Sequence, residues 1–511
     1  MTALLESLPP PDSYDQSSSM WVDEAIWGHR LYDEQLPWMV LLEFLNVFLY
    51  ELEKGRAFEE PNGFNTLKYR AAQRLYLRNI LFNNPRLPEI LLNFPSDGGR
   101  WDEWLQRMKS AQGIAHPDFS YLKARFHTFE DFNEIVSLIR STSLEVNSNK
   151  RWTSKFVFPY GQDCLYEDLD KNASSNDRRF FGRTGEMLYL MLCRTSRKAE
   201  LRAALSGRLS QTDATWDTIV KCLQPADDDQ MSAERANAFL PYTSHQCFNE
   251  LAADWLATLR LSIPGFDVLP HLVNLAGLHL LKYQLTVSRQ SLGLSGGVNL
   301  ICEVVVPKKT LVREVSCDLY QENNLLPARA VEAFISNIEM SSDWQNALSE
   351  SDSFEKCSAI LRNKARWGED YEGPRDPQQL IAALRQAAMK RHRQHVANIH
   401  RNYGREVGLV SRRGTLKLRY APTDSLLRTL LFATVEKRTE LHQFLDTLFQ
   451  RYGIVFGDKE AEQVLARDQL DKKAFQANSR RLEQRLASLG LLKRLSDGCA
   501  YVINPYWTEG R

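Results

Sequence analysis

Apolar residues recur at intervals of three and four positions along the first part of this chain. Two segments show the spacing most clearly: Met39, Leu42, Phe44, Leu45, Phe48 and Leu49, followed by Leu75, Leu77, Ile80 and Leu81. This interval matches the 3.6-residue turn of an α-helix and predicts helices with one buried face. We therefore expect an all-helical domain over residues 21–140. The preceding residues 1–20 are rich in Pro, Ser and Asp, which favours a disordered N-terminus.

The pattern becomes mixed between residues 141 and 340. Two long segments with helical spacing lie between residues 248 and 289, whereas Leu300–Val306 is β-branched and ends before Pro307. Because β-branched residues favour strands, we expect a strand here, and residues 311–315 are candidates for its partner. These segments predict a mixed α/β middle domain.

The sequence Gly-Arg-Thr-Gly-Glu at residues 182–186 precedes an apolar run. Glycines at a helix start allow backbone N–H groups to approach an anion. The spacing, however, matches neither a P-loop nor a dinucleotide-binding fingerprint. We favour a tight turn into a buried helix, with Arg183 paired with Glu186. The alternative is an enzyme with an active site in residues 141–338, near these two side chains.

A polar and then basic connector is expected over residues 341–420. Asp376 before Pro377 predicts a helix start, because Asp caps a helix and Pro fits its first turn. Residues 385–419 hold ten Lys and Arg residues against a single acid. Such a concentration favours a polyanion partner or an acidic face in the same assembly. The alternative is a connector helix that packs on the N-terminal half of the chain.

The clearest signal lies in residues 421–511. A helix is predicted over residues 472–489 with Asp471 as its N-cap, and two short strands flank Ser496-Asp497-Gly498. Asp-Gly between two apolar runs favours a hairpin, because type I′ turns require positive φ at both central residues. A helix followed directly by a hairpin is typical of a winged helix-turn-helix, which usually places its helix in a DNA groove.

Positive side chains lie mostly off the apolar stripe of this predicted helix. Exposed lysines and arginines neutralise phosphates, and amide side chains hydrogen-bond base edges. The candidate DNA contacts are Lys472, Lys473, Gln476, Arg480, Arg481, Gln484 and Arg485 of the helix, Lys493 and Arg494 of the hairpin, and Arg391, Arg393, Arg412 and Arg413 of the connector. Asn478 is a further candidate for contacting base edges.

Composition limits the remaining possibilities. The chain carries 64 basic and 64 acidic residues, so only local charge can support nucleic-acid binding. Eight scattered cysteines form no Cys-x-x-Cys pair, and no further ligand completes a zinc site at His392, His395 and His400. We expect no metal and no cofactor, and no known catalytic motif assigns a catalytic residue. Without a signal-peptide pattern or a long apolar span, we expect a cytoplasmic protein that does not contact a membrane.

Residues 489–505, Leu-Gly-Leu-Leu-Lys-Arg-Leu-Ser-Asp-Gly-Cys-Ala-Tyr-Val-Ile-Asn-Pro, look like the wing of a prokaryotic winged helix. Together with Phe180–Leu192 and the helical front half, they give the chain a resemblance to accessory subunits of bacterial anti-phage defence clusters. Those multi-gene systems act on methylated or phosphorothioated DNA. The resemblance implies a non-catalytic partner of a nuclease, methyltransferase or ATPase.

The combined expectation is a mainly α (α+β) protein with a C-terminal winged helix. It would bind double-stranded DNA and other protein subunits of the same system. The competing interpretation is a scaffold whose helical domains and winged helix bind only proteins.

Overall fold

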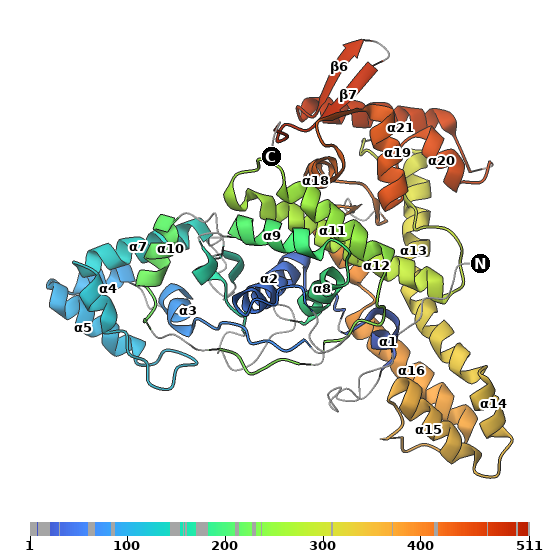
Figure 1. Ribbon diagram of the computed structural model, residues 1–511, viewed down its shortest axis with the longest axis horizontal. Coiled ribbons are helices and arrows are strands. Elements are labelled where there is room, and N and C mark those ends of the chain that lie inside the picture. The colour runs from blue at the N-terminus through green and yellow to red at the C-terminus, as the bar shows by residue number, and fades with distance from the viewer. Residues whose placement is uncertain are drawn as a thin grey trace.

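The computed structural model describes most of the chain: residues 8, 21–29, 31–59, 67–82, 87–143, 154–156, 158, 161–169, 182–209, 214–226, 231–236, 238–307, 310–369, 371–412, 417–467, 469–496 and 499–508. These residues are mainly helical, which confirms the expected class. Helices between residues 75 and 143, joined by a helix at residues 214–222, form a lobe at one end of a central body (Figure 1). The helices at residues 37–53, 184–193, 246–259 and 269–291 lie together in that body (Figure 1). The helices between residues 342 and 395 form an arm, and residues 424–503 form a C-terminal unit that packs on the central body (Figure 1).

Helices predominate from the first described element onward. The N-terminal elements are α1 (Asp23–Trp27), α2 (Pro37–Glu53), α3 (Leu75–Phe82), α4 (Leu87–Asn93), α5 (Asp97–Met108), α6 (Tyr121–Arg125) and α7 (Phe129–Ser143). The lobe has its own core, in which Trp101 and Trp104 pack edge-on against each other and around Phe132. Helix α2 instead packs against α8 and α12 in the central body. The apolar spacing thus predicted the helices correctly but not which neighbour each one contacts.

The central body is built around helices that are apolar on nearly every side. The chain continues as η1 (Ser154–Phe156), η3 (Gln162–Cys164), α8 (Thr184–Cys193), α9 (Lys198–Leu209), α10 (Ala214–Cys222), α11 (Gln246–Leu259), η4 (Gly265–Val268) and α12 (Leu269–Ser291). Of these, α10 packs in the lobe, whereas α8, α11 and α12 lie in the central body. Every residue of α8 is buried, and α12 is buried along most of its length between α2, α11 and α13. A helix buried all round lies in the interior of a large core.

The strand expected over Leu300–Val306 is much shorter in the structure. Only β1 (Leu300–Ile301) is a strand, and it pairs in parallel with β5 (Ile454–Val455) of the C-terminal unit. Residues 311–315 are not its partner, because they begin the long helix α13 (Leu311–Glu339). The Thr310 hydroxyl caps that helix by accepting a hydrogen bond from the Arg313 N–H at 3.2 Å. The predicted strand is therefore confirmed only at Leu300–Ile301, and its predicted pairing with residues 311–315 is wrong, because the Thr310 N-cap starts a helix there.

The arm and connector continue the chain as α14 (Ser342–Leu348), α15 (Ser353–Ala365), α16 (Pro377–His395), α17 (Ile399–Glu406), β2 (Val410–Ser411) and β3 (Arg419–Tyr420). The predicted start at Pro377 is confirmed, because an Asp376 carboxylate oxygen accepts a hydrogen bond from the Gln378 N–H at 3.2 Å. The helix that starts there ends at His395, and α17 begins at Ile399. Strands β2 and β3 pair antiparallel and return the chain to α13.

The C-terminal unit contains α18 (Asp424–Thr434), β4 (Arg438–Glu440), α19 (Leu441–Tyr452), β5, α20 (Asp458–Val464), α21 (Lys472–Ser488), β6 (Leu492–Ser496) and β7 (Cys499–Ile503). Strands β4, β7 and β6 lie in that order in an antiparallel sheet. The helix and both strands of the expected hairpin are confirmed. Its central residues, Asp497 and Gly498, lie outside the described part of the chain.

None of the described helices is both long enough and apolar enough to span a membrane.

Gly453 sits where α19 ends and the chain turns to pair with β1. It has φ +69°, and its carbonyl accepts a hydrogen bond from the Leu300 N–H at 2.7 Å. A Cβ placed there would lie 1.8 Å from the Val298 carbonyl oxygen. Gly490, which ends α21, also has positive φ (+73°), but a Cβ there would contact nothing within 4 Å.

We predict that Gly453→Ala lowers the stability of the protein by about 3 kcal/mol, because backbone strain and overpacking add. Gly490→Ala, which adds strain alone, should cost about 1 kcal/mol. Thermal melts of both variants test the difference. Equal melting temperatures for the two variants would show that the Gly453–Val298 contact imposes no constraint.

Candidate nucleic-acid interface

Helix α21 is held in the C-terminal unit by one apolar stripe and one buried amide. Phe475, Leu482 and Leu486 are fully buried along the stripe. Asn478 is buried beside them, and its side-chain NH2 donates to the carbonyls of Cys302 (2.9 Å) and Phe456 (3.0 Å). Its side-chain oxygen accepts a hydrogen bond from the Val304 N–H at 2.8 Å.

The expectation that Asn478 contacts base edges is therefore wrong. All of its hydrogen-bonding directions point into the protein, toward the segment that follows β1. An Asn in a polar helix resembles a surface residue in the sequence, so only the fold reveals this role. The amide fixes the rotation of α21 about its axis, and with it the face that points outward.

The outward face of α21 carries the residues predicted to contact DNA. Lys473, Gln476, Arg480 and Gln484 are exposed at intervals of three and four, and Arg481 is half-buried at the edge of this stripe. The side chains of Lys473, Arg480, Arg481 and Gln484 form no hydrogen bond or ion pair with any described residue. Their charges and amide are therefore available to a ligand.

Other candidates already have partners within the protein. The contacts are Lys472 with Glu462 (2.6 Å), Gln476 with Asp458 (2.8 Å), Arg485 with Asp424 (2.6 Å) and Arg494 with Glu483 (3.2 Å). Arg485 also donates to the Pro422 carbonyl at 3.0 Å. The hydrogen bond to Glu462 raises the pKa of Lys472. These pairs place acidic groups at both ends of α21 and leave the middle of its exposed face positive.

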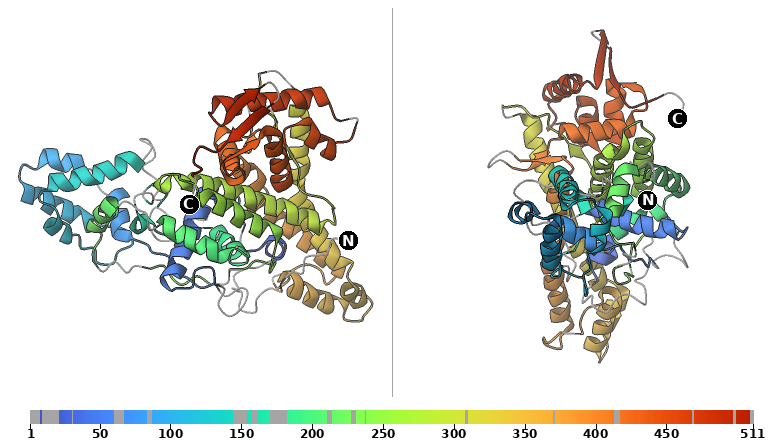
Figure 2. Two further views of the ribbon diagram at one scale, coloured as in Figure 1. Left: turned by 45° about the horizontal axis from the view of Figure 1, so that its top comes forward. Right: turned by 90° about the vertical axis from the view of Figure 1, so that its left-hand side faces the viewer.

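The β6–β7 hairpin projects beyond α21 at the top of the molecule (Figures 1 and 2). Lys493 lies opposite Tyr501, on the sheet face that points away from buried Val502. Arg494 lies on the other face, where it reaches Glu483 of α21. The hairpin therefore offers Lys493 on one side and a neutralised Arg494 on the other.

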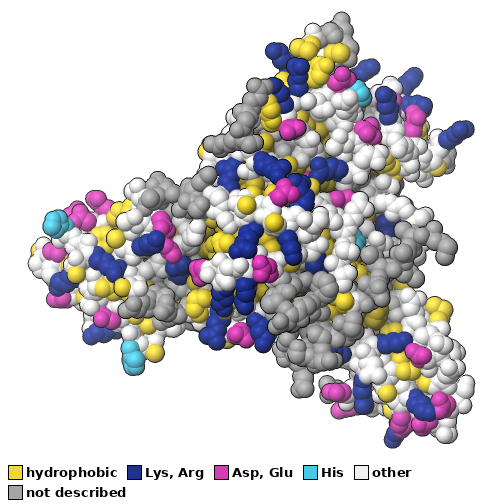
Figure 3. Space-filling view, viewed as in Figure 1, with side chains coloured by type: hydrophobic (Ala, Val, Ile, Leu, Met, Phe, Trp, Pro, Cys, Tyr) yellow, Lys and Arg dark blue, Asp and Glu magenta, His cyan; other side chains and the backbone are white. Residues whose placement is uncertain are grey.

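Two further basic residues of this surface were not among the sequence candidates. Arg438 of β4 lies over the Tyr501 ring, 5.4 Å from its centroid, and Lys437 lies 4.3 Å from the centre of the Trp507 ring. Both are exposed, and Lys and Arg side chains gather around the hairpin in the space-filling view (Figure 3). The Lys-Arg dipeptide at the start of the short strand β4 was the signal available in the sequence.

The basic residues of the connector are dispersed in space. Arg385 pairs with Glu332 (3.1 Å) and Glu339 (2.8 Å) of α13, and Arg391 pairs with Glu24 of α1. Helix α16 runs along the arm, on the other side of α12 and α13 from α21 (Figure 1). Its basic face was expected to join the helix of the C-terminal unit, and the structure does not bring the two together.

The other connector candidates differ in their surroundings. Arg393 is exposed and donates to the Met389 carbonyl at 3.2 Å, and Arg412 is exposed next to β2. Arg413 lies outside the described residues. Arg419 is fully buried in an ion pair with Glu303. The contact of the connector with α1 matches the alternative in which it packs on the N-terminal half of the chain, whereas its contact with α13 lies outside that half.

His392 and His400 of the connector are buried at separate positions, whereas His395 is half-buried. His392 lies 3.6 Å from Asp23, and the His400 ring stacks on Tyr420, whose hydroxyl is 3.0 Å from the His400 Nε2. Burial lowers the pKa of His400 to about 3. Among the described residues, no group of His, Cys, Asp and Glu side chains is arranged to hold a metal ion.

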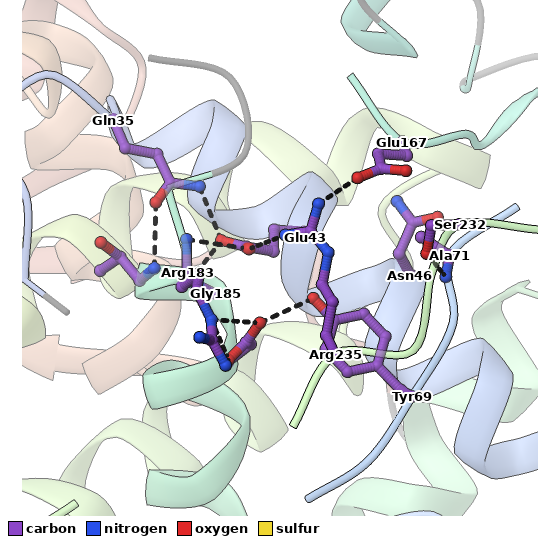
Figure 4. A network of polar contacts seen from close by, with 12 residues as sticks. Gln35, Glu43, Asn46, Tyr69, Ala71, Glu167, Arg183, Gly185, Ser232 and Arg235 are labelled. Carbon is purple, nitrogen blue, oxygen red and sulfur yellow. Dashed lines mark hydrogen bonds and ion pairs between the residues drawn. The ribbon is translucent and has the colours of Figure 1, made fainter. Parts of the chain in front are cut away.

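A buried polar network occupies the region proposed for an alternative active site (Figure 4). Arg183, with φ +75°, forms an ion pair of 2.9 Å with Glu186 at the start of α8. Glu43 of α2 accepts hydrogen bonds from the Arg183 and Gly185 N–H groups, each at 2.9 Å, and Tyr69 donates to Glu186 at 2.9 Å.

This network confirms the tight turn into a buried helix and the Arg183–Glu186 pair. Both Glu43 and Glu186 are fully buried, and burial raises the pKa of Glu43 to about 7. Their oxygens accept hydrogen bonds from Gln35, which precedes α2, from the backbone at the start of α8, and from Tyr69. The network therefore joins parts of the chain that are distant in sequence, which is a structural role.

A protein family matches part of the chain. Residues 320–505 match the family described as methylation-associated defense system protein MAD7. The matched region runs from the middle of α13 through the arm to the end of β7 and covers less than half of the chain. A comparison with curated proteins finds no match. The family match supports the expectation that the chain is a component of a defence system.

We predict that Asn478→Ala destabilises the protein by about 3 kcal/mol, because it leaves two carbonyls and one N–H buried without partners. Gln484→Ala, on the exposed face of the same helix, should change stability by less than about 0.5 kcal/mol. Urea unfolding of both variants measures this difference. A mild effect at Asn478 would mean that α21 is held by its apolar stripe alone.

His400 should make the protein sensitive to acid. Its pKa is about 3 in the folded protein and about 6.5 when unfolded, so the unfolded state binds the proton more tightly. The contribution of His400 to the free energy of unfolding is therefore present above about pH 6.5 and is lost as the pH falls toward 3. We predict a loss of about 2 kcal/mol between pH 8 and pH 5 that His400→Gln removes. Melting curves of the two proteins at several pH values test this, and parallel pH profiles would contradict it.

Proposed function

We propose that the C-terminal unit is a winged-helix domain that binds double-stranded DNA. The chain would act as a non-catalytic component of a multi-subunit defence complex in the bacterial cytoplasm. The observation that carries this proposal is the exposed stripe on α21, where Lys473, Arg480, Arg481 and Gln484 have no partner among the described residues. The stripe lies next to a projecting hairpin that carries Lys493.

The order of elements supports the winged-helix assignment. A helix, a short strand, further helices and a hairpin follow one another from α18 to β7, and the hairpin strands join β4 in an antiparallel sheet. In winged helices the helix before the hairpin lies in the DNA groove. Helix α21 occupies that position, and Asn478 sets its rotation.

The existing ion pairs distinguish basic side chains that are free to contact phosphate from those that already have an acidic partner. Arg480 and Arg481 can approach phosphates without breaking an existing ion pair, whereas Lys472, Arg485 and Arg494 must first give up an acidic partner. Gln484 is the amide best placed to reach a base edge, because Gln476 already bonds Asp458. A second contact through Arg391, Arg393, Arg412 and Arg413 is a separate proposal, since α16 lies beyond α13.

The competing function is a protein-interaction scaffold. It is favoured by the zero net charge of the chain and by the several basic residues that pair internally. A scaffold would bind duplex DNA weakly and without preference for the α21 face. One titration with matched variants separates the two functions.

We predict that Arg480→Glu/Arg481→Glu weakens duplex binding at least about tenfold, because two phosphate contacts are lost and two repulsive charges are added. The slope of log affinity against log salt concentration should become less negative by about 2, since each phosphate contact contributes about −0.9 to this slope. Fluorescence anisotropy with a labelled duplex at several salt concentrations measures both quantities.

Arg329→Glu/Arg362→Glu is the matched control, because both arginines are exposed on α13 and α15 and carry the same charge change. It should bind duplex within about twofold of the wild type. Lys472→Ala should fall between the two, because Glu462 already neutralises that lysine. Equal losses in the test and control variants would favour the scaffold.

A further inference from the structure

A groove lies on the side of the C-terminal unit where α13 passes beneath α20 and the start of α21 (Figure 1). Its volume is about 340 Å³. One wall is the first half of α13, and the other is the segment between α20 and α21. We name it the α13 groove. It shares no residue with the exposed stripe of α21.

The floor of the α13 groove is apolar. Leu311, Val315 and Leu319 follow one another at intervals of four residues, so they form one row along α13. Leu465 and Leu470 face them from the other wall. Leu311 is 38% exposed, and the other four side chains are half-buried. The row thus leaves an apolar strip open to a ligand.

The rim of the α13 groove is acidic. Glu314, Asp318 and Glu322 repeat at the same four-residue interval beside the apolar row, and Asp471 lies across the groove. Asp318 and Glu322 are exposed, and neither forms a hydrogen bond or ion pair with a described residue. Like charges at this spacing repel one another by a few tenths of a kcal/mol each, which an incoming cation relieves.

We propose that the α13 groove binds a basic amphipathic helix of a partner protein. An apolar strip with acidic margins is complementary to a helix whose apolar stripe is flanked by Lys and Arg. From Leu311 to Glu322 the wall measures about 16 Å at 1.5 Å per residue, which matches about three turns of the bound helix. The proposal does not depend on DNA contact by α21.

The test uses a synthetic probe and the full-length protein without DNA. A fluorescent peptide of about 14 residues carries leucines at intervals of three and four, lysines beside them and alanines elsewhere. A scrambled peptide has the same composition and charge but no apolar stripe. Anisotropy titrations should show saturable binding of the first peptide and at least about tenfold weaker binding of the second.

Asp318→Lys/Glu322→Lys should weaken binding of the amphipathic peptide at least about tenfold, because attraction at the rim becomes repulsion. Neither substitution removes a contact with a described residue, and circular dichroism checks the fold. Glu134→Lys/Glu372→Lys changes the charge equally at exposed positions elsewhere and should bind within about twofold of the wild type.

Hydrogen exchange provides the second measurement. The bound peptide should slow exchange in residues 311–322 and 465–470 and leave α21 beyond residue 476 unchanged. Absence of saturable binding, equal binding of the scrambled peptide, or protection outside the groove would overturn the proposal. Loss of duplex binding in Arg480→Glu/Arg481→Glu with unchanged peptide binding would show that the two surfaces act separately.

Discussion

The orientation of the C-terminal unit depends on the extended segment of residues 300–304, which lies between this unit and the central body. The N–H groups of Leu300 and Cys302 donate to the carbonyls of Gly453 (2.7 Å) and Val455 (2.9 Å). The next residue, Glu303, donates from its N–H to the Tyr420 carbonyl, and Val304 donates to Asn478 of α21. Successive backbone groups thus bond to different elements, so α21 cannot rotate without breaking buried hydrogen bonds. Its exposed face is a fixed feature of the whole molecule.

Ion pairs reinforce the same junction. Fully buried Glu303 accepts from Arg313 and Arg419, and buried Asp254 of α11 accepts from Arg451 and Tyr452 at the end of α19. Arginines that look like part of a basic surface in the sequence therefore form ion pairs inside the protein. Lys473, Arg480 and Arg481 of α21 and Lys493 of the hairpin form no such ion pair with a described residue. Removing one partner from such a buried pair costs far more than losing an exposed one.

The sequence predicted those features that depend on neighbours along the chain. Asp376 and Asp471 cap their helices as expected, and the two hairpin strands follow α21 as the apolar runs indicated. Features that depend on distant neighbours could not be read from the same patterns. Asn478 is buried because it meets the segment after β1, and α16 lies apart from α21 because it packs on α1 and α13. Local spacing carries no information about either contact.

The most direct test of the account is a cross-link between the exposed face of α21 and duplex DNA. A photoreactive amino acid is placed at position 484 in the full-length protein, with position 329 on α13 as the comparison. Irradiation with a labelled duplex should give a cross-linked product at position 484 and none at position 329. Cross-linking at position 329 but not at 484, or at neither position, would contradict the claim that this face meets the duplex.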